Sequence, residues 1–262
     1  MLTLVPTPIG NLADISKRAI VALNEADVIF CEDTRVTKKL LNLLQIEYSN
    51  KTFYSMHSHN EKKVIQNLNP DLLNSKNCVY ISDAGMPAIS DPGAELVRFC
   101  QENNIKYSVI PGPSAFVLAF AASGFEGEFT FFGFLPHKGN EREKKLNEVI
   151  NNDKISILYE SPHRIEKLLK ELKTKIPQRT IFLAKELTKI HETFIKAKAK
   201  DIQLTNTKGE WVVIIDKGEK KQKTISSEDI LSLEIPPKIK AKILSKISGE
   251  KTKDIYNKLI QK

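Results

Sequence analysis

The first 120 residues alternate between short apolar segments and longer segments with apolar residues at helical spacing. The apolar segments predict strands at 2–5, 28–31, 78–82 and 107–111. The helical spacing predicts helices at 16–26, with Ser16 as N-cap, and at 36–44, 94–103 and 114–123. Strands that alternate with helices in this way form a mostly parallel sheet with helices on both faces. The sequence therefore predicts an α/β fold.

The second half of the chain has a different set of expected strands. We place them at 129–135, 155–160, 180–186, 192–199 and 210–216. Charged helices are expected at 140–151 and 162–173, between the first three strands. The later strands follow one another closely, which indicates an antiparallel or mixed sheet.

These patterns divide the chain into three parts. We expect an N-terminal α/β domain at 1–118, a second α/β domain at 119–222 and a helical, Lys-rich module at 223–262, with a linker at 217–225. In the tail, Ile239, Ile243 and Ile247 form one apolar stripe, and a second stripe follows the turn at 248–251; it consists of Ile255, Tyr256, Leu259 and Ile260. Two short helices joined by a Gly turn resemble a helix-turn-helix. The alternative is a helical hairpin that only caps the domain.

The composition is that of an ordinary globular protein. Of 262 residues, 41% are apolar and 27% charged, which excludes collagen, low-complexity disorder and a disulfide scaffold. No apolar run approaches the roughly 18–20 residues of a membrane span, and the N-terminus does not resemble a secretory signal. The widely spaced Cys31, Cys78 and Cys100 are expected to be buried, reduced thiols. We therefore expect a cytoplasmic protein with no membrane partner.

The net charge of +8 is unevenly distributed. Residues 1–120 carry 11 basic and 12 acidic residues, whereas residues 121–262 carry 29 and 20. One-sided positive charge is what binding to a phosphate backbone requires. Lys-rich tails also occur simply as solvated helices, so charge alone leaves a nucleic-acid partner open.

The loop SDAGMPAISDPG at 82–93 is the strongest functional signal in the sequence. It follows an apolar strand and contains two Gly, two Pro and two Asp. Gly permits a close backbone approach and Pro fixes φ, so the loop presents amides and carboxylates rigidly. In open α/β sheets, ligands bind at the carboxyl ends of the strands. These groups suit a ligand with ribose hydroxyls and an amino-acid end.

Other motifs limit the classes of enzyme and ligand that the sequence supports. Ser114, as the expected N-cap of a helix after PGP, could receive a carboxylate or phosphate. There is no GxGxxG, P-loop or GxSxG motif, which disfavours dehydrogenases, NTPases and triad hydrolases. His57 and His59 lack clustered Cys or further His, so no metal site is expected.

Three polar segments follow expected strands and could form the rim of an active site: EDTR at 32–35, YESPHR at 159–164 and KELTKIHE at 185–192. Each combines acids and bases and could either position a substrate or form surface ion pairs. Within them, Arg35 and Arg164 are candidate substrate contacts.

Nine motifs, taken in order, resemble the ribosomal small-subunit RNA ribose 2′-O-methyltransferases, S-adenosylmethionine enzymes of the tetrapyrrole-methylase fold. The motifs are PTPIGNLADIS, EDTR, HSHNE, SDAGMPAISDPG, IPGPSA, FFGFLP, YESPHRI, KELTKIHE and GEWVVII. The resemblance runs from Leu2 to about Asp216. Thr and a larger aliphatic residue are usual at Met86 and Ala88, and the tail is short. The resemblance implies two α/β domains with the methyl donor in the cleft between them, and a homodimer.

The resemblance also implies a donor site and a substrate. The donor residues are Pro8, Asp83, Gly85, Pro87, Ile89, Ser90, Ser114, Ala115, Leu135, Tyr159, Glu160, Ala184, Lys185 and Leu187. The implied substrate is a cytidine ribose in the decoding region of 16S rRNA, within the small ribosomal subunit. Methyl transfer to a 2′-hydroxyl needs positioning and a proton acceptor, but no metal. Candidates for the acceptor are Lys185, Glu160, His163 and Asp33.

Two alternative functions remain at this point. One keeps the fold and changes the substrate to a tetrapyrrole or to a protein, as in diphthine-type methylases. The basic second half disfavours a small anionic macrocycle as sole partner. The other is a non-catalytic RNA-binding module, which would not need the rigid loop at 82–93.

Overall fold

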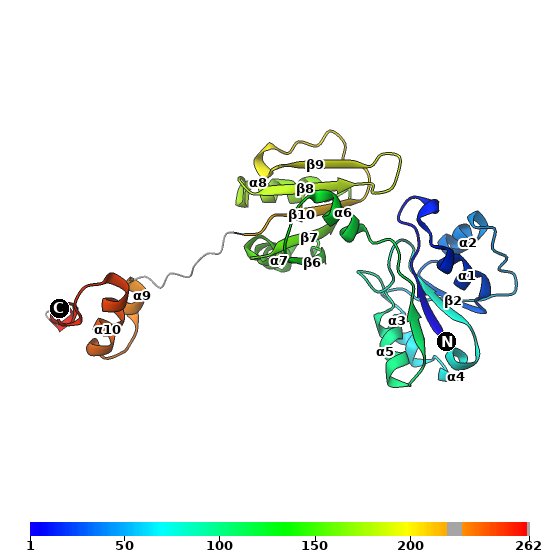
Figure 1. Cartoon of the computed structure of the whole chain (residues 1–262), viewed down its shortest axis with the longest axis horizontal. Helices are drawn as coiled ribbons and strands as arrows, with labels where there is room; N and C mark the ends of the chain where they lie inside the picture. The colour runs from blue at the N-terminus through cyan, green and yellow to red at the C-terminus, as the bar shows by residue number, and fades with distance from the viewer. Residues whose placement is uncertain (219–226, 261–262) are drawn as a thin grey trace. The chain divides into compact units, whose positions relative to one another are not determined.

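Two five-stranded sheets form the framework of residues 1–218. The computed structural model describes residues 1–218 and 227–260. The chain divides into two compact units, Met1–Gly218 and Glu219–Lys262, and each is described by itself (Figure 1). Within the first unit, we call the first sheet with its helices the first lobe and the second sheet with its helices the second lobe.

The first sheet is parallel throughout and has the strand order β3-β2-β4-β1-β5. Its strands are β1 (Leu2–Val5), β2 (Val28–Cys31), β3 (Thr52–Ser55), β4 (Cys78–Ile81) and β5 (Tyr107–Val109). One face packs against α1 (Lys17–Glu25) and α2 (Thr34–Leu43). The other face packs against α3 (Glu61–Gln66), α4 (Pro70–Ser75) and α5 (Ala94–Glu102). β4 lies at the centre, so the loop that follows it opens at the middle of the carboxyl edge.

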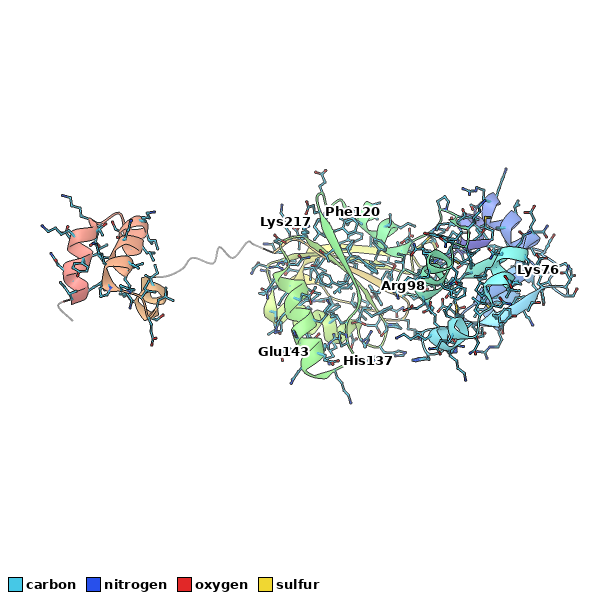
Figure 2. All side chains as sticks on the ribbon, turned by 90° about the horizontal axis from the view of Figure 1, so that it is seen from below. Lys76, Arg98, Phe120, His137, Glu143 and Lys217 are labelled. Atoms are coloured by element: carbon cyan, nitrogen blue, oxygen red, sulfur yellow. The ribbon has the colours of Figure 1, made fainter. Side chains whose placement is uncertain are left out.

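The second sheet is mixed, with the order β6-β7-β10-β8-β9. Its strands are β6 (Phe129–Phe134), β7 (Ile155–Glu160), β8 (Thr180–Lys185), β9 (Thr193–Lys198) and β10 (Trp211–Ile215). Only β6 and β7 are parallel. One face packs against α7 (Gly139–Asn151) and α8 (Ile165–Lys175), and the other against α6 (Ala115–Ser123). Figure 2 shows Glu143 of α7 and Phe120 of α6 on opposite sides of this sheet.

The described residues of the second unit, 227–260, form three short helices. They are α9 (Ser227–Ser232), α10 (Pro237–Ser248) and α11 (Thr252–Ile260). Ile230, Ala241, Leu244 and Ile255 form its small core. Gly249 ends α10 in the left-handed conformation, with φ of +74°, as expected of a helix C-cap glycine.

The α/β fold, the parallel first sheet and the mixed second sheet are confirmed. The sequence analysis missed β3, α3 and α4 because β3 is short and largely exposed and α3 is polar. The expected boundary at 222/223 and most of the linker at 217–225 lie outside the described residues. The boundary at 118/119 falls inside α6, which packs on the second sheet, so the chain passes between the lobes in the segment between β5 and this helix.

The structure adds two details to the expected helices. Ile239 and Ile247 do not share a buried stripe, because the side of α10 that packs inward carries Ala241 and Leu244. Ser114 stands at the N-cap position of α6, but its side chain makes no capping hydrogen bond.

Backbone contacts hold the loop at 82–93 against the rest of the first lobe. The N–H of Thr7 donates to the Gly85 carbonyl at 2.9 Å, and the N–H of Gly85 donates back at 3.1 Å. At the far end, Gly93 has a φ of +123°, and a Cβ there would lie 2.7 Å from Cε1 of Tyr80. The chain therefore needs glycine at residue 93 both for its backbone conformation and for the close approach of the buried Tyr80 ring.

We expect Gly93→Ala to lower the free energy of unfolding by about 2–4 kcal/mol, from backbone strain and overpacking together. Gly127 is the matched control, because its φ is +115° but nothing lies within 4 Å of a Cβ there. Gly127→Ala should lower the free energy of unfolding only through backbone strain, by about 1 kcal/mol. Urea unfolding followed by circular dichroism measures both, and equal losses would show that the contact with Tyr80 is unimportant.

Candidate functional site

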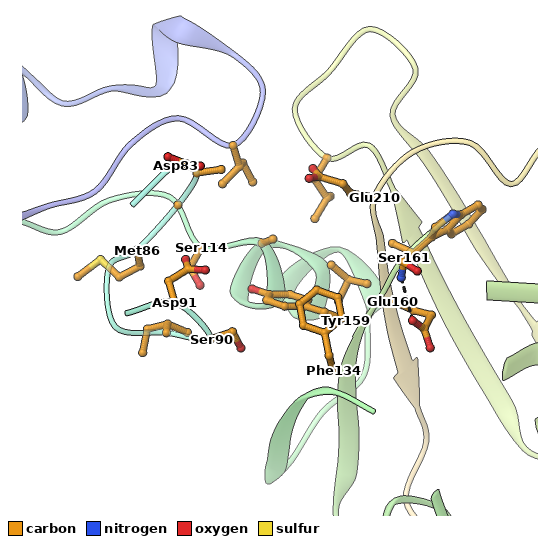
Figure 3. Close-up of a pocket in the computed structure, with 18 of the residues that line it drawn as sticks. Asp83, Met86, Ser90, Asp91, Ser114, Phe134, Tyr159, Glu160, Ser161 and Glu210 are labelled. Atoms are coloured by element: carbon orange, nitrogen blue, oxygen red, sulfur yellow. Dashed lines mark hydrogen bonds between the residues drawn. The ribbon is translucent and has the colours of Figure 1, made fainter. Parts of the chain in front are cut away.

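A cavity of about 380 Å³ lies between the two lobes of the first unit (Figure 3). Asp83, Asp91 and Ser114 face it from one side, and Phe134, Tyr159 and Glu210 from the other. The full lining is Ile9, Glu32, Asp83, Ala84, Gly85, Met86, Ile89, Ser90, Asp91, Ser114, Ala115, Phe134, Tyr159, Glu160, Ser161, Pro162, Leu187, Glu210, Trp211 and Val212. A cavity of this size fits a nucleoside-sized ligand.

Three carboxylates crowd the wall that the first lobe contributes. Glu32 follows β2, and both Asp83 and Asp91 lie in the loop after β4. The N–H of Asp83 donates to Glu32 Oε1 at 3.1 Å, and the N–H of Asp33 donates to Asp83 Oδ1 at 3.3 Å. These bonds bring together the ends of two neighbouring parallel strands.

Burial raises the pKa of all three carboxyl groups. The effect is largest for Asp91, whose pKa rises to about 7 because of burial and then because of the nearby Glu32 and Asp83 charges. The lining has no Lys, Arg or His among the described residues. This wall is therefore negatively charged and lacks a positive partner on the protein.

The loop after β4 reaches the second lobe through strained backbone. Ala88 and Ser90 both have a φ of +64°, which L residues rarely adopt. Gly133, at a bulge in β6, lies so close that a Cβ there would be 3.1 Å from the Ser90 hydroxyl oxygen. Glu61 of α3 accepts hydrogen bonds from the backbone N–H groups of Gly93 at 2.8 Å and Glu95 at 3.2 Å. It thereby ties the N-terminus of α5 to the end of the loop.

Aromatic and aliphatic side chains form the wall from the second lobe. Tyr159 and Phe134 lie with ring centroids 5.5 Å apart. The Tyr159 hydroxyl accepts a hydrogen bond from the N–H of Phe116 at 3.3 Å, and burial raises the pKa of Tyr159 to about 12. Its hydroxyl therefore stays protonated and fixes the first turn of α6 beside the cavity. The Phe134 ring is 53% exposed.

Glu160 is held by two arginines. Its Oε1 is 2.9 Å from Arg164 Nη2, its Oε2 is 3.8 Å from Arg142 Nη1, and its side chain is fully buried. Arg164 also donates to the Leu135 carbonyl at 2.9 Å, and Arg142 also pairs with Glu171 at 2.8 Å. This ion-pair cluster joins the ends of β6 and β7 to α7 and α8, so Glu160 and Arg164 both have structural partners.

The structure brings together about half of the residues expected at the site. Those that line the cavity are Asp83, Gly85, Ile89, Ser90, Ser114, Ala115, Tyr159, Glu160 and Leu187. Those outside its lining are Pro8, Pro87, Leu135, Ala184, Lys185, His163, Asp33, Arg35 and Arg164. Several residues of this second group are next to a lining residue in the sequence. They support the cavity wall without facing the cavity.

Asp33 and Arg35 form an ion pair at the edge of the first lobe. Asp33 is the N-cap of α2, and its Oδ2 lies 2.6 Å from Arg35 Nη2. The hydrogen bonds from Arg35 lower the pKa of Asp33 to about 2, so this carboxylate is a weak base. The Arg35 side chain is 89% exposed and can turn to a ligand outside the cavity.

Lys185 and His163 lie on the second lobe outside the lining of the cavity. The Lys185 ammonium lies 5.5 Å from the centre of the Trp211 ring and donates to the Asn206 carbonyl at 3.3 Å. Trp211 is part of the lining, so Lys185 is one side chain away from the cavity. His163 is exposed in the turn before α8.

The sequence analysis missed several lining residues. They are Ile9, Glu32, Ala84, Met86, Asp91, Phe134, Ser161, Pro162, Glu210, Trp211 and Val212. Most of them belong to the motifs already singled out, next to residues that were named. Position at a strand end would have found Glu32 and Asp91, because both carboxylates directly follow or lie within loops at the carboxyl edge.

The carboxylates and apolar side chains that line the cavity fit a cationic ligand with a nucleoside part. Carboxylates attract a positive charge and accept hydrogen bonds from ribose hydroxyls, whereas Ile9, Ile89 and Leu187 offer apolar surface. An anionic ligand such as a nucleoside triphosphate would be repelled. The described residues include no cluster of three or more His, Cys, Asp or Glu that could hold a metal ion. No helix in the described part is long and apolar enough to cross a membrane.

The family profile described as Tetrapyrrole (Corrin/Porphyrin) Methylases matches residues 1–203. The chain belongs to this family. Among solved structures, the methyltransferase CobJ superimposes with a TM-score of 0.59 at 17% identity, covering 82% of this chain and 93% of that one. Uroporphyrin III C-methyl transferase from Thermus thermophilus gives 0.56 at 16% identity, covering 83% and 97%. At these identities, the similarity shows the tetrapyrrole-methylase fold.

Closer sequence relatives carry another name. A protein named ribosomal RNA small subunit methyltransferase I from Campylobacter fetus is 47% identical over 270 residues, which cover 99% of this chain and all of that protein. A protein of the same name from Helicobacter pylori is 39% identical, over 98% of this chain and 96% of its own. The match spans both lobes and the helical tail.

We expect Asp91→Asn to stabilise the fold progressively as the pH rises from about 4 to about 7. The pKa of Asp91 is raised on folding, so the unfolded chain ionises first and wild-type stability falls over this range. The Asn variant lacks this ionisation. Its gain in free energy of unfolding over the wild type should therefore level off above pH 7. Urea unfolding at pH 5 and pH 8 measures the difference. An advantage of equal size at both pH values would contradict the raised pKa.

Proposed function

We propose that the protein transfers a methyl group from S-adenosylmethionine to the 2′-oxygen of a cytidine ribose in 16S rRNA, in the decoding region. The observation that carries the proposal is the full-length similarity to proteins named ribosomal RNA small subunit methyltransferase I. The acidic, nucleoside-sized cavity between the lobes supports it independently. The small ribosomal subunit is the proposed partner, and the cytoplasm the proposed location.

When bound, S-adenosylmethionine supplies a methyl group on a positively charged sulfonium. Asp83, Asp91 and Glu32 would face the positive charges and the ribose hydroxyls, and the first turn of α6 would hold Ser114 and Ala115 against the ligand. Ile89, Leu187 and Tyr159 would exclude water from the reacting centre. The chain thus contributes positioning and electrostatic complementarity.

The RNA would approach at the exposed rim of the cavity. Arg35, which is exposed although paired with Asp33, would turn towards phosphates there, and Phe134 is half exposed. The 2′-hydroxyl must lose its proton as the new bond forms. Of the groups that line the cavity, Asp91 is our candidate to accept it; the pKa of Asp91 is about 7 without a ligand, and a bound cationic donor would lower it. Lys185, which lies against the Trp211 ring, is a second candidate for the proton acceptor.

The reaction is tested by incubating the full chain with methyl-labelled S-adenosylmethionine and small subunits from a strain that lacks this protein. The rRNA is then digested with alkali. A 2′-O-methyl group blocks alkaline cleavage at its own phosphodiester, so label should appear in a dinucleotide. Label found only in mononucleotides would show base methylation and overturn the proposal.

We expect Asp83→Asn to weaken S-adenosylmethionine binding roughly tenfold or more, because a charge-assisted hydrogen bond contributes about 1.5–3 kcal/mol. Isothermal titration calorimetry measures the affinity, and circular dichroism checks the fold. The control is Asp71→Asn, which removes an equal charge from the exposed first turn of α4. Unchanged affinity in folded Asp83→Asn would remove this residue from the donor site.

A homodimer through the α6 side of the second lobe is also proposed. Among the described helices, the nine-residue α6 packs on that face of the sheet, together with Ile9, Phe125 and Leu187. Apolar side chains remain open to solvent there, with Val117, Phe129 and Phe194 each more than 40% exposed. A second copy would cover them and bury apolar surface that is otherwise in contact with water.

We expect Val117→Lys to convert the dimer to a monomer, because a buried lysine without a partner opposes association. Val21→Lys is the matched control, since Val21 is equally exposed on α1 of the first lobe. Sedimentation velocity gives the mass of each variant. A dimer that survives Val117→Lys would place the interface elsewhere.

A further inference from the structure

The lysines of the C-terminal unit fall into two groups. Its described residues contain seven lysines. The Lys240 ammonium donates to the Leu231 carbonyl at 2.7 Å, and that of Lys258 pairs with Glu250 at 2.9 Å. The other five make no hydrogen bond or ion pair with any described residue; they are Lys238, Lys242, Lys246, Lys251 and Lys253.

Three of the unpaired lysines lie on one side of α10. Lys238, Lys242 and Lys246 are spaced four residues apart, whereas the residues that pack inward are Ala241 and Leu244. Residues at this spacing are neighbours on a helix surface, and like charges there repel each other. The helix itself contains no acidic residue. The three lysines therefore do not stabilise the helix by pairing within it.

Ile239 lies beside Lys242 and Lys246 on this side of α10, whereas Ile247 lies nearer to the inward-packing Leu244. Ile239 and Ile247 are 49% and 53% exposed, although the sequence pattern suggests that both should be buried. An exposed surface of ammonium groups with one isoleucine offers charge for phosphates and apolar contact for a sugar or base. We call Lys238, Ile239, Lys242 and Lys246 the lysine face.

The charge distribution explains why an RNA enzyme needs this surface. The donor cavity is lined by unpaired carboxylates, and the first 120 residues carry one more acid than base. A polyanion gains little attraction from that part of the chain. Most of the electrostatic attraction must then come from the basic second half, where unpaired lysines are available.

We propose that the lysine face binds the phosphate backbone of the RNA substrate. The inference rests on the proposed function, because that function supplies the RNA. Each ammonium–phosphate contact releases counterions and makes affinity fall with salt, by about 0.7–0.9 in the slope of log K against log salt concentration. The face contributes affinity and leaves the chemistry to the cavity.

The test compares two double variants of the full chain that remove equal charge from the same unit. Lys242→Gln/Lys246→Gln removes two unpaired lysines, and Lys240→Gln/Lys258→Gln removes the two paired ones. Filter binding to small-subunit rRNA at several salt concentrations gives the dissociation constant and the slope. We expect the first variant to bind about tenfold or more weakly at 0.1 M salt, with a slope shallower by about 1.4–1.8. The control should stay near wild type.

Calorimetry with S-adenosylmethionine should show the same donor affinity in both variants, and circular dichroism the same helix content. Equal RNA affinity and slope in wild type and Lys242→Gln/Lys246→Gln would overturn the inference. So would a loss confined to binding of vesicles that contain phosphatidylglycerol, which would assign the face to an anionic lipid surface. In either case, continued 2′-O-methylation by wild type shows that the proposed function stands. Absence of that methylation would instead refute the function.

Discussion

Carboxylates that lie close together without a counter-ion repel one another, and three such groups share a wall of the cavity. Glu32, Asp83 and Asp91 come from two parallel strands whose carboxyl ends meet at the same edge of the first sheet. The repulsion must be resisted by contacts elsewhere. The Thr7–Gly85 bridge, the Glu61 cap on α5 and the packing of Gly93 on Tyr80 supply that restraint. The result is a wall whose negative charge is preorganised before any ligand arrives.

In the second lobe, by contrast, the buried charges are paired with charges of opposite sign. Glu160 pairs with Arg164 and Arg142 at the ends of β6 and β7, and Glu171 supplies the second negative charge beside Arg142. Removing one partner of such a buried cluster leaves an uncompensated charge, which costs more than the pair itself contributes. The motif around Glu160 therefore shapes the cavity by fixing the strand ends. Polar residues that look catalytic in a sequence can have this structural role.

Most of the architecture could be predicted from the sequence, because period-2 and period-3.6 patterns are strong where one face of an element is buried. β3 and α3 could not be predicted, because they are mostly exposed and so lack a periodic pattern of apolar residues. The loop at 82–93 stood out because Gly and Pro restrict the backbone visibly. The environment of each polar side chain could not be predicted. The nearby Arg35 made an ion pair of Asp33 one open alternative, whereas nothing local showed that Asp91 would be buried beside Glu32 and Asp83.

The position of Asp91 has a consequence for the thermodynamics of ligand binding. With a pKa of about 7, this carboxyl group is about half protonated in the empty cavity near neutral pH. A cationic ligand favours the ionised form, so its arrival expels part of a proton into the solution. The buffer takes up that proton, and its heat of ionisation adds to the heat released in the cavity. The observed binding enthalpy will thus depend on the buffer, and the slope of that dependence counts the protons that the ligand displaces.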